Sequence, residues 1–208
     1  MSTTDRLKIA IQKSGRLNPP SLALLASLGL EFLPSGNALL QPCRNADLDL
    51  LFLRDDDIPE YVSRGVADFA IVGENVLLEK QATVEVVRRL DFGRCRLVIA
   101  VPEASEIRDP RDLEGERIAT TYPHLLARYL KREHIDAAII PISGSVEITP
   151  ELNLADAVCD IVQTGNTLTA HRLRPLVTIL ESRAVLIGSP LRKKSKEPFL
   201  SLLPPVRV

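Results

Sequence analysis

A short turn rich in hydroxyl groups, Gln163–Thr167, follows an apolar run and opens a predicted helix at Asn166. The backbone N–H groups at the start of a helix have no partner within it, and the helix dipole favours an anion there. Asp156 and Asp160 precede the turn and offer carboxylates to sugar hydroxyls or a magnesium ion. The sequence therefore predicts a phosphorylated-ribose site. The alternative is an ordinary helix start, in which Gly165 supplies an unusual backbone angle.

Two other turns carry cations. Lys13 and Arg16 flank Ser14–Gly15 between a predicted strand and a predicted helix, a setting that suits a phosphate chain or a solvated turn. Arg54 ends an apolar strand, so its guanidinium should emerge at the edge of a sheet. There it could hold a diphosphate in a forked geometry, or pair with the aspartates that follow it.

Two further side chains are candidates for substrate contacts. Glu147 follows a small Gly144–Val146 turn and could accept a hydrogen bond from a hydroxyl, or be a plain exposed strand residue. Tyr122 could line a pocket for a base, or only begin a helix. Nothing in the sequence resembles a Ser-His-Asp set or an activated cysteine. The predicted chemistry is positioning and electrostatic stabilisation around phosphates.

Composition limits the class of protein. The chain has 208 residues, 45% hydrophobic and 25% charged, with a net charge of −1. These values are typical of a globular protein of one or two domains, and they argue against nucleic-acid binding as the main function. Three separated cysteines without a C-x-x-C pair argue against a disulfide framework or a zinc site. We expect a cytoplasmic protein, because no apolar run is long enough to cross a bilayer and no signal peptide is visible.

The order of predicted elements indicates an α/β fold. Predicted strands at Leu7–Ile11, Leu48–Arg54 and Asp68–Val72 alternate with helices, which predicts a parallel sheet with helices on its faces. The first helix has Asn18 as its expected N-cap, and Asp57 is the expected acidic cap of the second, with Glu60 completing a near capping box.

A second α/β series follows and predicts a second lobe. Its strands are expected at 96–101, 117–120, 137–142 and 160–162, with a helix at 123–133. Val177–Ile187 is long and apolar enough to carry the chain back to the first lobe. We therefore predict two lobes with parallel or mixed sheets, and an active site in the cleft between them, because ligands of such sheets bind beyond the carboxyl ends of the strands.

Taken together, these motifs resemble ATP phosphoribosyltransferase, the first enzyme of histidine biosynthesis. The resemblance runs in order from about Leu7 to Leu191 and rests on a set of separate segments, which are Ile9–Leu17, Arg54–Pro59, Ile71–Asn75, Arg88–Leu97, Ile118–Pro123, Gly144–Glu147 and Asp160–Leu168. It implies a glycosyltransferase in which N1 of the adenine of ATP attacks the anomeric carbon of phosphoribosyl pyrophosphate (PRPP) and releases pyrophosphate. Mg²⁺ would accompany PRPP, although no residue is assigned to the metal.

The resemblance also implies roles for residues. The loop from Asp160 to Leu168 would bind PRPP, with the 5-phosphate held by Thr164, Gly165, Asn166 and Thr167. Asp160, together with Asp156 and Glu147, would face the ribose. Arg54 would be the catalytic residue that grips the pyrophosphate. Lys13 and Arg16 would serve the phosphates of ATP or of pyrophosphate, and Ser14, Gly15 and Tyr122 would belong to the same ATP or phosphate site.

The fold implied is like that of type II periplasmic solute-binding proteins. Residues 1–94 and 180–208 would form the first lobe, and residues 95–179 the second lobe, which carries the PRPP loop. We expect no C-terminal regulatory domain, and on that expectation the chain resembles the short form of the enzyme. That form implies a homodimer of catalytic chains within a hetero-octamer, together with a regulatory subunit resembling histidyl-tRNA synthetase.

The sequence leaves two alternative functions open. The Asp109–Thr120 segment also looks like part of a solute-binding protein, so a module that binds a nucleotide without chemistry is one alternative. The other is a purine or pyrimidine phosphoribosyltransferase. Those enzymes usually show two adjacent acids before the turn, whereas Asp156 and Asp160 are separated.

Overall fold

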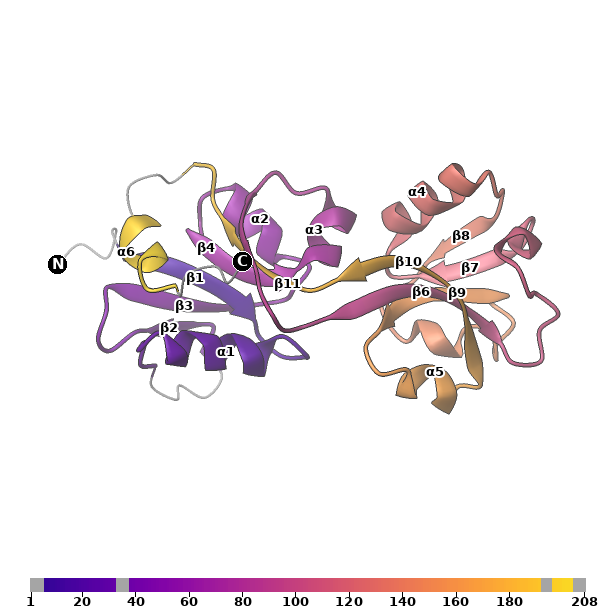
Figure 1. Ribbon diagram of the computed structural model, residues 1–208, viewed down its shortest axis with the longest axis horizontal. Coiled ribbons are helices and arrows are strands. Elements are labelled where there is room, and N and C mark those ends of the chain that lie inside the picture. The colour runs from indigo at the N-terminus through magenta and orange to yellow at the C-terminus, as the bar shows by residue number, and fades with distance from the viewer. Residues whose placement is uncertain (1–5, 33–37, 192–195, 204–208) are drawn as a thin grey trace. The chain divides into compact units, whose positions relative to one another are not determined.

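The computed structural model describes residues 6–32, 38–191 and 196–203. The chain divides into two compact lobes, each described here by itself: the first lobe is residues 1–93 with 183–208, and the second lobe is residues 94–182. Each lobe is built on one mixed sheet with helices on its faces (Figure 1). The predicted α/β fold class with mixed sheets is confirmed.

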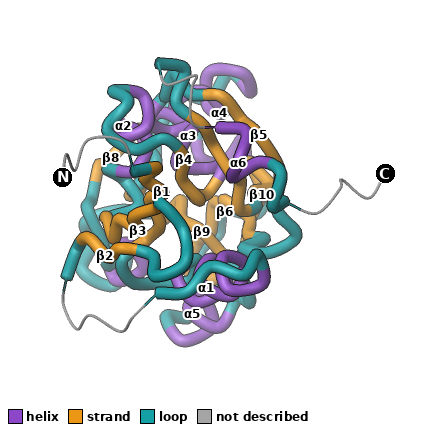
Figure 2. The backbone as a smooth tube through the Cα atoms, turned by 90° about the vertical axis from the view of Figure 1, so that its left-hand side faces the viewer, coloured by secondary structure: helices purple, strands orange, loops and turns teal. Residues whose placement is uncertain are grey.

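The first lobe contains a six-stranded sheet in the order β2-β3-β1-β4-β11-β5. Its strands are β1 (Leu7–Gln12), β2 (Leu40–Pro42), β3 (Leu48–Leu53), β4 (Phe69–Gly73), β5 (Glu85–Arg89) and β11 (Ala184–Gly188). β3 and β4 lie parallel to β1 on its two sides, whereas β2, β11 and β5 run antiparallel to their neighbours. Figure 2 shows β2, β3 and β1 side by side. The carboxyl ends of β1, β3 and β4 therefore meet at one edge of this sheet.

Alternating side chains of these strands build two cores, one on each face of the sheet. On one face, Ile9 and Ile11 lie in a cluster with Leu25 of α1 (Asn18–Ser27) and Phe199 of α6 (Lys196–Leu200). On the other face, Ala10 lies in a cluster that includes residues of α2 (Ile58–Ser63) and α3 (Glu74–Lys80) (Figure 1). The apolar runs predicted from the sequence are thus covered on both faces.

The second lobe contains a five-stranded sheet in the order β10-β6-β9-β7-β8. Its strands are β6 (Cys95–Pro102), β7 (Arg117–Thr120), β8 (Ala138–Pro141), β9 (Ala157–Val162) and β10 (Leu173–Ser182). β7 runs parallel to both β8 and β9, while β6 is antiparallel to β9 and β10 is antiparallel to β6. The carboxyl ends of β7, β8 and β9 consequently share one edge.

Two helices cover opposite faces of the second sheet (Figure 1). α5 (Asn166–Ala170) lies over a core that includes Val158, Val162 and Leu168. α4 (Pro123–Glu133) begins with a proline in its first turn, carries Lys131 and Arg132 in its last turn, and buries its leucines. Proline suits the first turn of a helix because its missing N–H would have no intrahelical partner there. Lysine and arginine suit the last turn because it is the negative end of the helix dipole. Two short 3₁₀ turns, η1 (Pro110–Leu113) and η2 (Val146–Ile148), complete the lobe.

Both helix caps of the first lobe differ from the ones that the sequence predicts. The N-cap of α1 is Leu17, and the Asn18 side-chain amide instead donates to the carbonyl oxygens of Gln12 (2.7 Å) and Lys13 (3.2 Å). Asp57 occupies the N-cap position of α2 but makes no side-chain capping hydrogen bond. The expected capping box is also absent, because Glu60 pairs with Arg64 one turn further along the helix.

Candidate functional site

Three loops meet at the carboxyl edge of the parallel strands in the first lobe. The Lys13 N–H donates to the Leu53 carbonyl at 2.7 Å, which joins the ends of β1 and β3. Across the same edge, Nη2 of Arg16 lies 3.5 Å from Oδ1 of Asn75. A methyl group on Gly73 would come within 2.4 Å of that oxygen. The approach of the loops therefore depends on a glycine at the end of β4.

The Arg16 side chain connects its own loop to two other segments of the first lobe, at Asn75 and at Gly93. Its guanidinium is half-buried and donates from Nη1 to the Gly93 carbonyl at 2.7 Å. Lys13, Ser14 and Gly15 are exposed, and Gly15 has φ +106°, a backbone angle that favours glycine. The structure places the four predicted phosphate contacts in one loop, with Arg16 partly engaged within the lobe.

Arg54 stands where the sequence predicts, immediately after β3, and its side chain is exposed. Its guanidinium makes no hydrogen bond or ion pair with any residue that the structure describes. The alternative of a salt bridge to its aspartate neighbours is not realised, since Asp56 instead pairs with Lys80 at 3.7 Å. The guanidinium is therefore available to a ligand.

Asp55, beside Arg54, was not singled out from the sequence. Burial raises the pKa of its carboxyl group, the nearby charge of Asp56 raises it further, and Arg16 offsets part of the effect. A half-buried acid among arginines is the kind of group that accumulates at functional sites. Its only sequence signal is its place directly after a strand of the parallel sheet.

The carboxyl edge of the second sheet brings three polar side chains together. The Thr121 hydroxyl donates to Oδ1 of Asp160 at 3.3 Å, and Glu147 is close enough to influence the charge of Asp160. Burial raises the pKa of the Asp160 carboxyl group, Glu147 adds to the rise, and hydrogen bonds from the Ile161 backbone and from Thr121 oppose it. Asp160 and Glu147 thus place two carboxyl groups near this edge, where they could accept hydrogen bonds from sugar hydroxyls.

Thr121 is a member of this group that the sequence alone did not identify. The register of the parallel strands pairs Thr120 with Cys159, which places the next residues, Thr121 and Asp160, side by side at the strand ends. The neighbouring Tyr122 is half-buried and opens α4, and its N–H donates to the Thr120 hydroxyl at 2.9 Å. The pairing register of β7 and β9, which a single sequence does not reveal, is what identifies Thr121.

The hydroxyl-rich turn lies directly beyond Asp160. Gly165 is the N-cap of α5, with φ +87° and no side-chain capping bond, while Thr164, Asn166 and Thr167 are exposed. The N–H groups of the first helical turn therefore face outward without intrahelical partners. Because α5 has only five residues, these N–H groups and the hydroxyls matter more than the dipole.

Leu168 and Asp156 lie beyond opposite ends of β9. The Leu168 side chain is buried in the core of the second lobe and anchors the turn. Asp156 lies before the start of β9, at the opposite end of that strand from the turn. An extended strand rises about 3.3 Å per residue, which separates residue 156 from the turn by roughly 20 Å.

The Asp156 carboxylate instead forms an ion pair with Arg117. Nη2 of Arg117 lies 2.8 Å from Oδ1, and Nε lies 2.9 Å from Oδ2. The side-chain hydrogen bond from Arg117 lowers the pKa of Asp156 to about 2. The expectation that Asp156 faces a ribose beside Asp160 is therefore wrong, because residues four apart in a strand lie far from each other.

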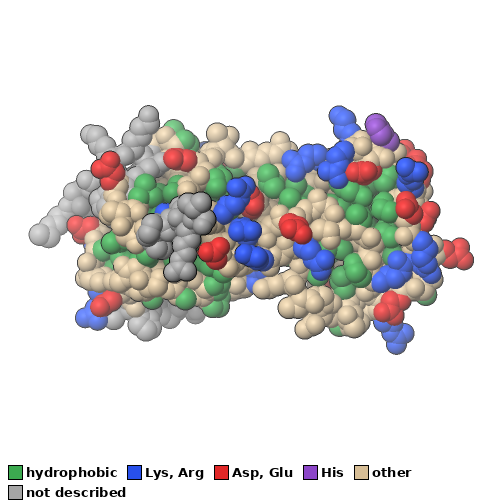
Figure 3. All heavy atoms as spheres, viewed as in Figure 1, with side chains coloured by type: hydrophobic (Ala, Val, Ile, Leu, Met, Phe, Trp, Pro, Cys, Tyr) green, Lys and Arg blue, Asp and Glu red, His purple; other side chains and the backbone are tan. Residues whose placement is uncertain are grey.

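Two searches of the described residues bear on metals and membranes. Within residues 6–32, 38–191 and 196–203, no group of three or more His, Cys, Asp or Glu side chains could hold a metal ion. No helix in the same residues is long and apolar enough to span a bilayer. On the face of the second lobe shown in Figure 3, acidic and basic side chains are interspersed.

Comparison with known proteins gives a consistent result. A family model described as ATP phosphoribosyltransferase matches residues 54–204. The ATP phosphoribosyltransferase of Cytophaga hutchinsonii is 47% identical over 203 residues, covering 98% of this chain and 70% of its own length. That of Xylella fastidiosa is 49% identical over 193 residues, covering 88% of this chain and 64% of its own length. The chain thus spans about two thirds of these curated relatives.

Solved structures extend the comparison to the fold. A chain of the ATP phosphoribosyl transferase (HisG:HisZ) complex from Thermotoga maritima is 31% identical, with a TM-score of 0.80 over 94% of this chain and 93% of that one. The alkanesulfonate-binding protein SsuA from Xanthomonas axonopodis shares the fold alone, at 19% identity and a TM-score of 0.59 over 94% of this chain and 69% of that one. The predicted likeness to solute-binding proteins is confirmed.

Proposed function

Because the chain belongs to the ATP phosphoribosyltransferase family, we propose that it transfers the 5-phosphoribosyl group of PRPP to N1 of ATP and releases pyrophosphate. This is the first step of histidine biosynthesis. The observation that carries the proposal is the arrangement at the edge of the second sheet, where Asp160, which accepts a hydrogen bond from Thr121, lies in the strand that leads into an exposed turn with free N–H groups. Hydroxyl acceptors beside a phosphate cradle suit a phosphorylated ribose.

The proposed PRPP site uses the residues of this edge. Thr164 to Thr167 hold the 5-phosphate through backbone N–H groups and hydroxyls, and Leu168 anchors the turn from below. Asp160 and Glu147 face the ribose, and Thr121 orients Asp160. Asp156 has no part in this site, since it is paired with Arg117 at the other end of β9.

In the proposed reaction, the bond between N1 of adenine and C1′ of ribose forms as the bond from C1′ to the pyrophosphate oxygen breaks. Positive charge develops on the ribose, where the carboxylates of Asp160 and Glu147 stabilise it. Negative charge grows on the departing pyrophosphate, and Arg54 neutralises it with its unpaired guanidinium. Lys13 and Arg16 serve the phosphates of ATP or of pyrophosphate, with Ser14, Gly15 and Tyr122 beside them.

Mg²⁺ is part of the proposal as the companion of PRPP. The described residues offer no cage of three or more ligands, which fits an ion held mainly by substrate phosphates with one or two carboxylates. Asp160 and Glu147 are the carboxylates that would complete its coordination. Bound there, the ion would neutralise charge on the diphosphate of PRPP.

The partners follow from the likeness to a chain of the HisG:HisZ complex. We propose that this chain is a short-form catalytic subunit, which forms homodimers and joins a regulatory subunit resembling histidyl-tRNA synthetase in a hetero-octamer. Its proposed location is the cytoplasm, where ATP and PRPP are made. Histidine would then inhibit the reaction through the partner subunit.

The test is a direct assay. The protein is mixed with ATP, PRPP and Mg²⁺, with and without the regulatory subunit, and both pyrophosphate release and adenine absorbance are followed. Turnover that requires both substrates supports the proposal. Reaction of free purine bases in place of ATP would assign a different phosphoribosyltransferase, and binding of both substrates without turnover, even with the partner, would assign a binding module.

A further inference from the structure

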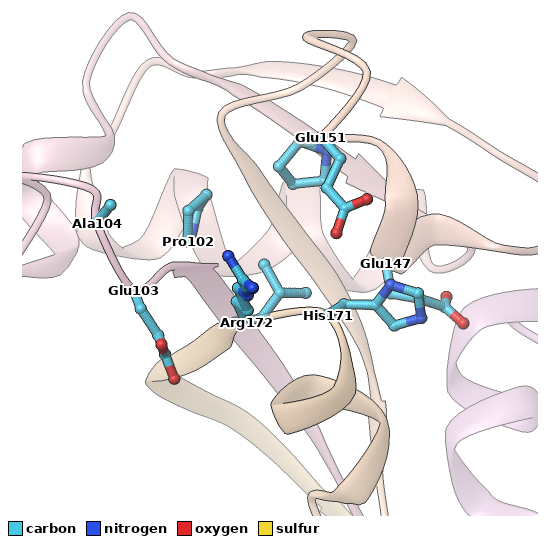
Figure 4. A pocket seen from close by; sticks show the side chains of 9 residues that line it. Pro102, Glu103, Ala104, Glu147, Glu151, His171 and Arg172 are labelled. Carbon is cyan, nitrogen blue, oxygen red and sulfur yellow. The ribbon is translucent and has the colours of Figure 1, made fainter.

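A pocket of about 610 Å³ opens in the second lobe; its lining includes Glu147 of the proposed ribose site but no residue of the hydroxyl-rich turn. It lies between η2 and the segment that links α5 to β10, with the end of β6 as its floor (Figure 4). Its size is within the range of small-molecule sites. Its apolar wall includes Pro150 and Leu173, and its polar side chains carry charges of both signs.

Five polar side chains of this wall have unused bonding capacity. They make no hydrogen bond or ion pair with any residue that the structure describes, and they belong to Glu103, Glu147, Glu151, His171 and Arg172. Figure 4 shows Glu151 and Arg172 reaching into the same space from different segments of the wall. Opposite charges that share a cavity without pairing leave both available to a ligand.

The backbone at Arg172 adds an independent observation. Arg172 has φ +51° and follows His171, the C-cap of α5. Glycine is the usual residue at this position of a helix end, because a side chain in the left-handed region costs about 1 kcal/mol. The chain instead carries a long cation there, and this conformation sends the side chain into the pocket.

The charges define the ligand. A purely cationic molecule would leave Arg172 without a partner, and a purely anionic one would lie against Glu147 and Glu151. A molecule with an ammonium group at one end and a carboxylate at the other satisfies both signs. We propose that this pocket binds a small α-amino acid, with its ammonium group at Glu147 and Glu151, its carboxylate at Arg172, and its side chain against Pro150 and Leu173.

The site is tested by binding alone, in the absence of ATP and PRPP, so that its failure is distinct from failure of the proposed reaction. Calorimetry and ligand-observed NMR would be run with L-alanine, L-glutamine, L-histidine and L-arginine. Propylamine and propanoate, which carry only one of the two charges, serve as matched probes. We expect at least one amino acid to bind saturably, and about tenfold or more tightly than either matched probe.

Variants connect the binding to the pocket. Arg172→Gln and Glu151→Gln should each weaken the amino acid about tenfold, while Arg111→Gln, at an exposed arginine in η1, should leave it unchanged. Glu147 is left intact because it also serves the proposed ribose site. Circular dichroism confirms that each variant is folded. Equal affinity for amino acids and one-charge probes, unchanged affinity in Arg172→Gln, or no saturable binding of any amino acid would overturn the proposal.

Discussion

The hydroxyl of Thr121, the residue that follows β7, donates a hydrogen bond of 3.3 Å to Oδ1 of Asp160 in the neighbouring strand β9. The two residues are 39 positions apart in the sequence. Their contact fixes the direction of the carboxylate that precedes the hydroxyl-rich turn. An acid held in this way loses less freedom when it binds a sugar hydroxyl.

Replacing Thr121 with valine tests this orientation. The Thr121→Val side chain keeps the shape of threonine but cannot donate to Asp160. We expect kcat/KM for PRPP to fall by about three- to tenfold, since one hydrogen bond to a charged group is lost. Steady-state kinetics with PRPP varied at saturating ATP would measure it. Thr178→Val is a suitable control, because Thr178 is exposed on the edge strand β10, and a similar loss in that control would contradict the assignment.

The Asp160 carboxylate should lower the stability of the folded protein while it supports turnover. Its pKa is raised by burial, so the folded protein favours the protonated form, and the charged form opposes folding as pH rises through the folded-state pKa. Asp160→Asn should therefore raise the melting temperature at pH 7, and the difference should shrink in acid, where Asp160 is neutral. Turnover should fall by about a hundredfold. Thermal melts at several pH values, with an activity assay, would show whether both effects occur.

Asp156 should behave in the opposite way. Its pKa is lowered to about 2 from 3.8 by Arg117, so its contribution to stability is present above about pH 4 and is lost as pH falls towards 2. Both side chains are partly exposed, at 43% for Arg117 and 31% for Asp156, and solvent screening keeps the contribution of the pair small. Asp156→Asn should lower the melting temperature slightly at pH 7 and leave kcat/KM for PRPP within about twofold. A hundredfold loss of activity in Asp156→Asn would instead show that Asp156 takes part in the ribose site.

Arg54 is expected to act on the departing pyrophosphate. Arg54→Ala should reduce kcat by about a hundredfold and leave the affinity for ATP nearly unchanged, because charge grows on pyrophosphate only in the transition state. Pre-steady-state turnover and equilibrium ATP binding would separate the two. Arg64→Ala, which removes an exposed arginine of the same lobe that pairs with Glu60, is the matched control. Loss of ATP binding without loss of kcat would show that Arg54 does not stabilise the departing pyrophosphate.

The elements that sequence reasoning located well have strong periodicity. β7 and α4 occupy the predicted residues, and Arg54 follows a strand as expected. β2 has three residues and includes Pro42, and β5 is half-exposed with two arginines, so neither has a clear alternating pattern. The predicted return segment Val177–Ile187 is divided between β10 and β11, which pair in different sheets. Pairing partners of this kind are set by tertiary contacts that a local pattern does not contain.

The candidate site was harder to predict than the fold. Asp156 and Asp160 look like neighbours in the sequence, but the strand between them separates their side chains. Thr121 became visible only through strand register, and the pocket at Arg172 needed the backbone conformation. The roles of Arg54, the loop of Lys13 and Arg16, and the hydroxyl-rich turn stay predictions, as does the placement of an active site between the lobes.

The turn from Thr164 to Thr167 offers the most direct test. Backbone amide signals of the ¹⁵N-labelled protein would be followed by NMR as PRPP and Mg²⁺ are added without ATP. The account predicts that the amides of Thr164, Gly165, Asn166 and Thr167 shift most, together with that of Asp160. Saturable PRPP binding that leaves these amides in place and moves others would contradict it.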